Sequence, residues 1–356
     1  MPELYDITEW NEQPWLNTGG TRNKKIYQSP ADLKLYYFKQ SFKRLSKDYK
    51  YEFWSEIIAY ELGKMCGFNV LPYHIAVRGG EVGCISKSMI NSDKEELVEG
   101  GRYIQAFDNA FNPDDRSLRH RYSFELIAAS LKFLGFEKYI SDIIEMLVFD
   151  ALIGNSDRHQ ENWALINTHS GISKSFAGIE FLLTHEKRLK EMPGWLVKFL
   201  KKMYTKNGSL RKEYRRAKLS LPKKTRFSPI YDNGCSFGRE LLDDKVVQMI
   251  NDDKLVDAYV KKGLSEIHWK DKKVSHFVLL TNLLKEEKFR EMVQNPVKRV
   301  IERFKAQKFS ELISKVDVDL PLECQYIRIP SERKELMSKL VLSRIARLKA
   351  LIEEEN

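Results

Sequence analysis

The sequence predicts an α+β fold of two lobes, with a small strand-rich lobe over residues 1–98 and a larger, mainly helical lobe over residues 99–356. Short aromatic and β-branched runs bounded by glycine and proline dominate the first part, and such runs favour strands. Apolar residues at helical spacing dominate the second part. The 356 residues are enough to bury a sizeable core and to form two or three such units.

Three strands and one helix are expected in the first lobe. The strands are residues 33–38, 70–77 and 81–90. Arg78, Gly79 and Gly80 suit the turn that joins the last two strands. A helix is expected over residues 52–66, ended by Gly67. Four of its apolar side chains lie near one face: Phe53, Ile57, Tyr60 and Leu62.

Helices are expected through most of the second lobe, because apolar residues recur there three and four positions apart. This spacing is clearest over residues 122–134, 139–153 and 334–354. The polar residues 91–101 end in two glycines and are expected to connect the lobes.

A basic insertion is expected at residues 170–226 of the second lobe. Within it, residues 186–226 hold fifteen Lys and Arg against three Glu. Aromatic residues are interleaved with these charges, namely Trp195, Phe199, Tyr204 and Tyr214. One interpretation is a docking surface for an anionic partner. The alternative is an amphipathic helical insertion whose outer face is solvated.

The strongest chemical signal is the segment GNSDRHQENW at residues 154–163, which follows an apolar helix. It holds Asp157 and Asn162 five positions apart. Phosphoryl transfer needs a carboxylate that orients a hydroxyl and accepts its proton, and an amide oxygen nearby that holds Mg²⁺. The spacing alone is a weak signal, and Arg158 and His159 directly after the aspartate make it more specific.

A second signal is FSPIYDNGCSFG at residues 227–238, where a short strand-like run ends in Asp232, Asn233 and Gly234. A carboxylate on such a tight turn can present its oxygens to Mg²⁺, which takes hard oxygen ligands. By itself the segment is better explained as a surface turn. It gains meaning from lying downstream of Asp157 and Asn162, in the order that kinases use.

The first lobe supplies candidates for nucleotide binding. A glycine turn precedes the first strands, and its backbone N–H groups can approach phosphate oxygens. It consists of Thr18, Gly19, Gly20, Thr21 and Arg22. Lys39 ends an apolar strand, where it either protects a sheet edge or reaches the phosphates with a helix carboxylate beside it. Glu52 and Glu56 are the candidate carboxylates, and Glu56 is preferred because Ile57 and Ile58 follow it.

In this order, the residues resemble the HipA-like serine/threonine kinases of bacteria, in particular the compact members that lack a separate amino-terminal extension. The passages that carry the resemblance are SEIIAYELGKMCGFNVLP (55–72), DRHQEN (157–162) and SPIYDNG (228–234). The likeness covers residues 17–100 and 122–240 and is weaker in the basic insertion and the last hundred residues.

The resemblance implies a role for each candidate residue. Asp157 would be the general base, and Asn162 and Asp232 would be the Mg²⁺ ligands. Lys39 would hold the ATP phosphates, with Glu56 as its ion-pair partner. The adenine would lie near the connector after the strand at 81–90, beside Ser86, Lys87 and Met89.

Two departures from ordinary protein kinases stand out. Arg158 and His159 follow the catalytic aspartate instead of preceding it, as in phosphoinositide and related lipid kinases. Asn233 and Gly234 follow the metal-binding aspartate where ordinary kinases have Phe-Gly. His159 either neutralises charge on the transferred group or bonds only to the loop backbone. Arg158 either clamps a substrate or forms a salt bridge.

The expected function is therefore that of an ATP- and Mg²⁺-dependent serine/threonine protein kinase. The family resemblance also implies a toxin–antitoxin module with an antitoxin partner, and self-phosphorylation, for which Thr18, Thr21 and Ser29 are candidates. Two other functions stay open. One is a kinase for a small molecule or lipid headgroup, and the other is a non-catalytic, basic nucleic-acid-binding protein on a kinase-like fold.

The bulk composition agrees with a cytoplasmic protein that meets anionic partners. The net charge is +10 and the pI is about 9.1. The four cysteines are scattered without metal-ligand spacing and are expected to be reduced thiols. The amino-terminus has no signal-peptide pattern, and no apolar run reaches the roughly 20 residues of a membrane helix.

Overall fold

The computed structural model describes most of the chain, and it divides into two compact units. The described residues are 2–14, 16, 24–41, 43–44, 47–90, 95–112, 115–168, 193–195, 197–198 and 224–353. The larger unit comprises Met1–Met89, Glu99–Trp163 and Pro229–Asn356, and the smaller one Ile90–Val98 and Ala164–Ser228. The lobe boundary at residues 98 and 99 stays a prediction. The glycine turn at residues 18–22 and most of the basic segment 186–226 lie outside the described residues.

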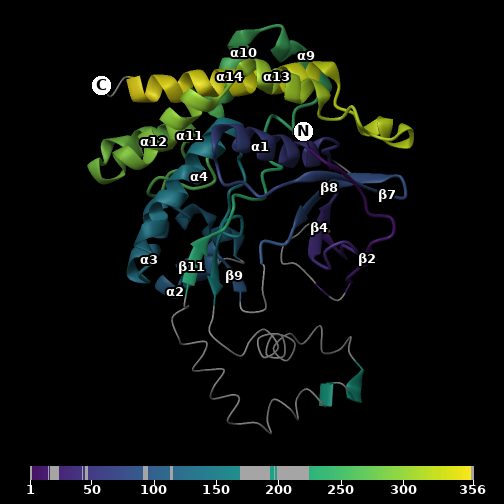
Figure 1. Cartoon of the computed structure of the whole chain (residues 1–356). Helices are drawn as coiled ribbons and strands as arrows, with labels where there is room; N and C mark the ends of the chain where they lie inside the picture. The colour runs from purple at the N-terminus through teal and green to yellow at the C-terminus, as the bar shows by residue number, and fades with distance from the viewer. Residues whose placement is uncertain are drawn as a thin grey trace. The chain divides into compact units, whose positions relative to one another are not determined.

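Among the described residues, six strands of the larger unit form one mixed sheet in the order β1-β7-β8-β4-β3-β2 (Figure 1). Only β1 and β7 pair in parallel; the other neighbours are antiparallel. The strands are β1 (Leu4–Asp6), β2 (Asn11–Glu12), β3 (Lys24–Gln28), β4 (Leu35–Lys39), β7 (His74–Arg78) and β8 (Glu81–Lys87). Gly79 and Gly80 have φ of +55° and +83°, so the glycines allow the tight turn between β7 and β8.

The two faces of this sheet differ in chemistry, because side chains alternate along each strand. One face carries an apolar cluster of Ile7, Tyr27, Phe38, Ala76 and Ile85. On the other face, Lys39 of β4 lies directly across from Cys84 of β8. Helix α1 (Glu52–Cys66) contacts β8. The sheet therefore presents the end of β4 to a buried helix.

Helix α1 begins and ends where the sequence predicts, and Gly67 ends it with φ +81°. The expected single apolar face is too narrow a description, because the helix is buried on nearly every side and Tyr60 is only half-buried. Even Glu52 and Glu56 have no exposed surface. Buried carboxylates need partners, and these define the site described below.

The rest of the larger unit is mostly helical, and α9–α13 contact α14, α4 or both, whereas α2 and α3 contact each other (Figure 1). The α-helices are α2 (Gly100–Phe107), α3 (Phe124–Phe133), α4 (Ile140–Ile153), α9 (Asp243–Ile250), α10 (Asp253–Lys262), α11 (His276–Lys285), α12 (Glu287–Arg303), α13 (Ala306–Lys315) and α14 (Ser331–Glu353). The short 3₁₀ helices are η1 (Arg116–Arg121), η2 (Glu137–Tyr139) and η3 (Leu322–Ile327). The predicted α+β fold class, with a sheet first and mostly helices after it, is confirmed.

Several predicted segments have different limits in the structure. The strand expected at 33–38 is Leu35–Lys39, and the one expected at 81–90 ends at Lys87. The strand expected at 70–77 begins only at His74, because the segment before it pairs with Ile230 instead. The backbone N–H of Leu71 donates to the oxygen of Ile230, and the N–H of Ile230 donates to the oxygen of Asn69. The connector expected at 91–101 contains strand β9 (Glu95–Glu99) and the start of α2. In the smaller unit, β9 joins β10 (Ala164–Thr168) and β11 (Lys224–Phe227) in a three-stranded sheet. A separate two-stranded hairpin is formed by β5 (Lys43–Arg44) and β6 (Lys47–Asp48).

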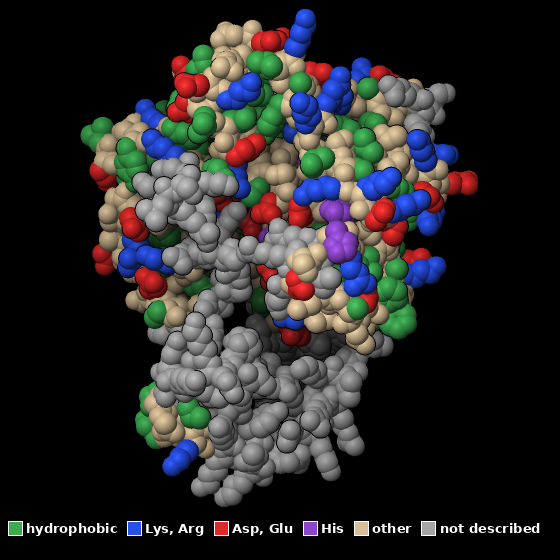
Figure 2. Space-filling model, turned by 180° about the vertical axis from the view of Figure 1, so that it is seen from behind, with side chains coloured by type: hydrophobic (Ala, Val, Ile, Leu, Met, Phe, Trp, Pro, Cys, Tyr) green, Lys and Arg blue, Asp and Glu red, His purple; other side chains and the backbone are tan. Residues whose placement is uncertain are grey.

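The described residues also bear on the expectations drawn from composition. None of their helices combines the length and the hydropathy that crossing a membrane requires. All four cysteines are among the described residues, and none forms a disulfide. On the face seen in Figure 2, Lys and Arg side chains are interspersed with Asp and Glu.

Gly100 is predicted to be essential for packing at the start of α2. A Cβ atom there would lie 2.0 Å from the ring of Trp163, which is buried at the end of the 154–163 loop. We expect Gly100→Ala to lower the free energy of unfolding by about 2–3 kcal/mol, because the core is close-packed. Urea denaturation measures this. Arg102→Ala, at an exposed position of the same helix, serves as the control, and equal urea midpoints for the two variants would contradict the prediction.

Candidate active site

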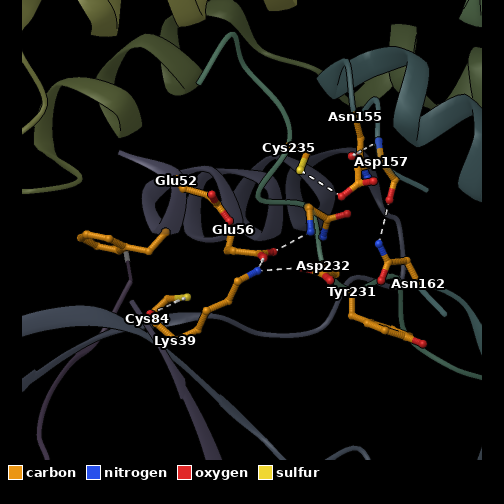
Figure 3. A network of polar contacts seen from close by, with 12 residues as sticks. Lys39, Glu52, Glu56, Cys84, Asn155, Asp157, Asn162, Tyr231, Asp232 and Cys235 are labelled. Carbon is orange, nitrogen blue, oxygen red and sulfur yellow. Dashed lines mark hydrogen bonds and ion pairs between the residues drawn. The ribbon is translucent and has the colours of Figure 1, made fainter. Parts of the chain in front are cut away.

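Residues from four separate segments gather beside α1 in the larger unit (Figure 3). Lys39 ends β4, and Glu56 lies in α1. Asp157 and Asn162 lie in the loop after α4, and Asp232 lies in the turn after the Val70–Ile230 bridge. Five residues predicted from the sequence thus lie in one region, although up to 193 positions separate them along the chain. They are Lys39, Glu56, Asp157, Asn162 and Asp232.

Lys39 forms ion pairs with two carboxylates. Its Nζ contacts Oε1 of Glu56 and lies 2.6 Å from Oδ1 of Asp232. The side chains of Lys39 and Glu56 are 5% and 0% exposed, whereas that of Asp232 is 15% exposed. The pairing compensates for the cost of burying these charges. Lys39 therefore joins the sheet, α1 and the Asp232 turn in one buried cluster.

Glu56 also holds the backbone of the Asp232 turn. Its Oε2 accepts a hydrogen bond of 2.7 Å from the backbone N–H of Asn233. Asp232 itself has φ +57°, a left-handed conformation that costs free energy for a residue other than glycine. The contact of Glu56 with Asn233 and the ion pair with Lys39 both help to stabilise it. The turn predicted from the sequence is thus a strained turn that α1 supports.

The loop after α4 is ordered by its own amides. The backbone N–H of Asp157 donates to Oδ1 of Asn155 (3.2 Å), and Nδ2 of Asn162 donates to the backbone oxygen of Asp157 (2.7 Å). Because Asn162 uses its amide nitrogen in this bond, its amide oxygen is the atom that can face a cation. The Asp157 carboxylate accepts a hydrogen bond from the thiol of Cys235 at 3.4 Å (Figure 3).

Arg158 has a structural role, which is the second of the two interpretations its sequence position allows. Its side chain is 1% exposed and pairs with the equally buried Asp150 of α4, the nearest atoms being 2.7 Å apart. It also donates to the backbone oxygens of Asn162 and Tyr231 and to Oδ1 of Asn233. Burial raises the pKa of the Asp150 carboxyl, and the Arg158 guanidinium acts against that rise. Arg158 thereby ties the 154–163 loop to the Asp232 turn.

His159 lies at the edge of this cluster. Its Nδ1 accepts a hydrogen bond from the backbone N–H of Glu161 (3.3 Å), so the contact with the loop backbone exists. Its side chain is 19% exposed. A catalytic part for His159 stays a prediction.

The residues expected near the adenine do not share one orientation. Ser86 pairs with Tyr37 and lies on the same sheet face as Lys39. Lys87 is one position further and lies on the opposite face, where its Nζ contacts Asp32 at 2.6 Å. Met89 follows the end of β8. Nucleotide contacts of these residues stay predictions, and the Lys87 side chain is directed elsewhere.

Three further residues of this region were not predicted from the sequence, namely Lys24, Arg239 and Cys235. Lys24 begins β3 directly across from Lys39, and only the strand register places it there. Arg239 contacts Glu52 at 2.8 Å and Cys235 at 2.9 Å. Two sequence features could have indicated the contacts of Arg239. Glu52 lies one helical turn before Glu56, and Cys235 lies three residues after Asp232.

The donor set fits Mg²⁺ bound together with a nucleotide. Within the described residues, no group of three or more His, Cys, Asp or Glu side chains could hold a metal by itself. Mg²⁺ is commonly bound by one or two protein oxygens together with substrate phosphates and water. Asn162 and Asp232 would supply such oxygens. Lys39 carries one positive charge against the two carboxylates that it contacts, which leaves local negative charge suited to a cation.

Comparison with known proteins supports the fold. No protein-family model matches the chain, and no curated protein matches it in sequence. Among solved structures, the Helicobacter pylori proinflammatory kinase CtkA matches with a TM-score of 0.66 and 15% sequence identity, over 99% of both chains. The chain therefore has the kinase-like fold of this compact kinase, as the resemblance found in the sequence implies.

A second solved structure also matches. It is a chain of the HipA, HipB and operator DNA complex of a toxin–antitoxin system from Shewanella oneidensis MR-1. The TM-score is 0.40 and the identity 12%, with coverage of 90% of this chain and 58% of the other.

The Arg158–Asp150 pair is predicted to be required for folding. Arg158→Met would leave a buried carboxylate without its cation, which costs about 3–5 kcal/mol. The double variant with Asp150→Asn should be less destabilised than Arg158→Met alone, because that charge is then removed. Urea denaturation checks both expectations. Lys349→Ala, which breaks an exposed pair with Glu353, is the control, with an expected cost of about 0.5 kcal/mol or less. A wild-type urea midpoint for Arg158→Met would refute the assignment.

Proposed function

We propose that this chain is an ATP- and Mg²⁺-dependent serine/threonine protein kinase. The observation that carries the proposal is the buried ion cluster of Lys39, Glu56 and Asp232, beside the loop that holds Asp157 and Asn162. The kinase-like fold shared with CtkA supports it. Phosphoryl transfer depends on positioning and on charge stabilisation more than on covalent chemistry, and this arrangement of charges suits both.

In the proposed reaction, each side chain has one task. The Lys39 ammonium, held by Glu56, binds the α- and β-phosphates of ATP. Asn162 and Asp232 would hold Mg²⁺, which would supply positive charge to neutralise the phosphate oxygens. The Asp157 carboxylate orients the acceptor hydroxyl and takes its proton. The hydroxyl oxygen then forms its bond to the γ-phosphorus as the bond to the β-phosphate oxygen breaks, and ADP leaves.

We further infer that the acceptor is a serine or threonine hydroxyl of another protein. The order of Asp157, Arg158 and His159 is also that of lipid kinases, so phosphorylation of a lipid headgroup is a separate outcome of the assay, as is binding of nucleic acid without phosphate transfer. An antitoxin partner, an anionic partner at residues 186–226 and a cytoplasmic location stay predictions from the sequence.

Self-phosphorylation also stays a prediction, with Thr18, Thr21 and Ser29 as its candidates. Ser29 directly follows β3 and is 3% exposed. Its Oγ accepts the backbone N–H of Ala31. Thr18 and Thr21 lie outside the described residues.

Loss of either proposed carboxylate should abolish kinase activity. We expect Asp157→Asn and Asp232→Asn each to lower the rate of phosphate transfer by about 100-fold or more, because each removes one element of positioning or charge stabilisation. The measurement is transfer of labelled phosphate from ATP, with Mg²⁺, to protein and to lipid fractions of a lysate. Asp271→Asn, at an exposed loop position, is the control. Full activity of Asp157→Asn would overturn the assignment, and label only in lipid would favour a lipid kinase.

Lys24 is predicted to bind the ATP phosphates. Cross-strand partners project from the same sheet face, so the Lys24 side chain lies on the face that carries Lys39, where it can approach the phosphates that Lys39 is proposed to bind. We expect Lys24→Met to raise KM for ATP about tenfold, equivalent to about 1.4 kcal/mol, with little change in kcat. Lys25→Met is the matched control, because Lys25 lies on the other face, 4.0 Å from Glu81. Equal KM values for both variants would contradict this role.

A further inference from the structure

Helix α1 carries a buried carboxylate besides that of Glu56, and the proposed reaction gives it no role. Glu52 lies one turn before Glu56 and has no exposed surface. Its Oε2 lies 2.8 Å from NH1 of Arg239, so the buried charge is paired. The side chain of Arg239 is 13% exposed, and its guanidinium lies over the ring of Tyr49 at 4.0 Å. The ion pair and the aromatic ring together fix the position of the guanidinium.

Arg239 extends this chain of contacts to a cysteine. Its NH2 group donates to Sγ of Cys235 at 2.9 Å. Cys235 is buried, and its backbone oxygen accepts the N–H of Ser156, next to Asp157 in the loop. The thiol is therefore held on one side by a guanidinium and lies beside the 154–163 loop.

The thiol in turn contacts the Asp157 carboxylate, as Figure 3 shows. Sγ of Cys235 donates to Oδ2 of Asp157 at 3.4 Å. The hydrogen bonds run in one direction, because the guanidinium can only donate, the thiol accepts and donates, and the carboxylate accepts. The contact thus constrains the carboxylate without competing for a proton from an acceptor hydroxyl.

We propose that Cys235 is a positioning residue that orients the Asp157 carboxylate, and that α1 holds it in place through Glu52 and Arg239. The inference rests on the proposed function, in which Asp157 accepts the proton of the acceptor hydroxyl. Helix α1 then supports both parts of the site. Glu56 holds Lys39 and the Asp232 turn, and Glu52 holds the group that orients Asp157.

This position makes specific demands on the side chain at 235. Serine keeps an acceptor for Arg239 and a donor for Asp157, whereas alanine keeps neither. Small errors in the geometry of a reacting group lower kcat, and binding of ATP at Lys39 does not depend on the Asp157 orientation. The inference therefore predicts a loss in kcat with an unchanged KM for ATP.

The test compares purified Cys235→Ala and Cys235→Ser with the wild type in the labelled-ATP assay. We expect Cys235→Ala to lower kcat about tenfold at constant KM for ATP, and Cys235→Ser to stay within about threefold of the wild type. Cys324→Ala is the matched control, because Cys324 is likewise a buried cysteine, and its Sγ lies 4.0 Å from the backbone oxygen of Gly80. Wild-type kcat in Cys235→Ala, or equal losses in the alanine and serine variants, would overturn the inference.

A second pair of measurements separates this inference from the proposed function. Arg239→Met should lower kcat in the wild-type background but add little in the Cys235→Ala background, because both act on the same carboxylate. Crystal structures of the wild type and Cys235→Ala give a readout that needs no activity, and the Asp157 carboxylate should be rotated or less ordered in the variant. If the wild type transfers no phosphate, the proposed function fails. An unmoved Asp157 in the variant structure overturns the positioning role whatever the activity.

Discussion

The buried ion cluster of Lys39, Glu56 and Asp232 is the interaction on which the site depends. Removing such charges from water costs several kcal/mol for each ion, and a buried pair is weak evidence for added stability. What the cluster does supply is a fixed geometry, because one ammonium joins a strand, a helix and a strained turn. The left-handed backbone of Asp232 persists because Glu56 bonds to the next residue and Lys39 to its side chain.

A second buried ion pair, between Arg158 and Asp150, fixes the geometry of the 154–163 loop that precedes this turn. Arg158 uses Asp150 as its counter-ion and spends its remaining donors on both functional segments, at Asn162, Tyr231 and Asn233. The arrangement couples the two loops, since neither can move without breaking bonds to the same guanidinium. The planar, multiply donating guanidinium suits this role, which a lysine ammonium could not fill with the same geometry.

Much of the local structure was open to prediction from the sequence. The limits of α1 follow from its apolar content and from Gly67, and the turn at Gly79 and Gly80 follows from glycine tolerance of positive φ. Asp157, Asn162 and Asp232 could be selected because phosphoryl transfer limits the residue types and their order. The apolar neighbours of Glu56 made it the preferred candidate over Glu52, yet both side chains are equally buried. The residues next to a position in the sequence do not show which other elements pack around the helix there.

The sequence alone therefore determined the fold class, the positions of α1, α3, α4 and α14 to within a few residues, the turn at Gly79 and Gly80 and the choice of polar residues suited to phosphate chemistry, because these depend on short-range periodicity and on residue type. Only the tertiary structure decided which partners those residues have. The pairing of Lys24 with Lys39 comes from strand register, and the chain from Glu52 through Arg239 and Cys235 to Asp157 joins segments far apart in sequence. Such contacts depend on how helices and strands pack in three dimensions, which local sequence patterns do not encode.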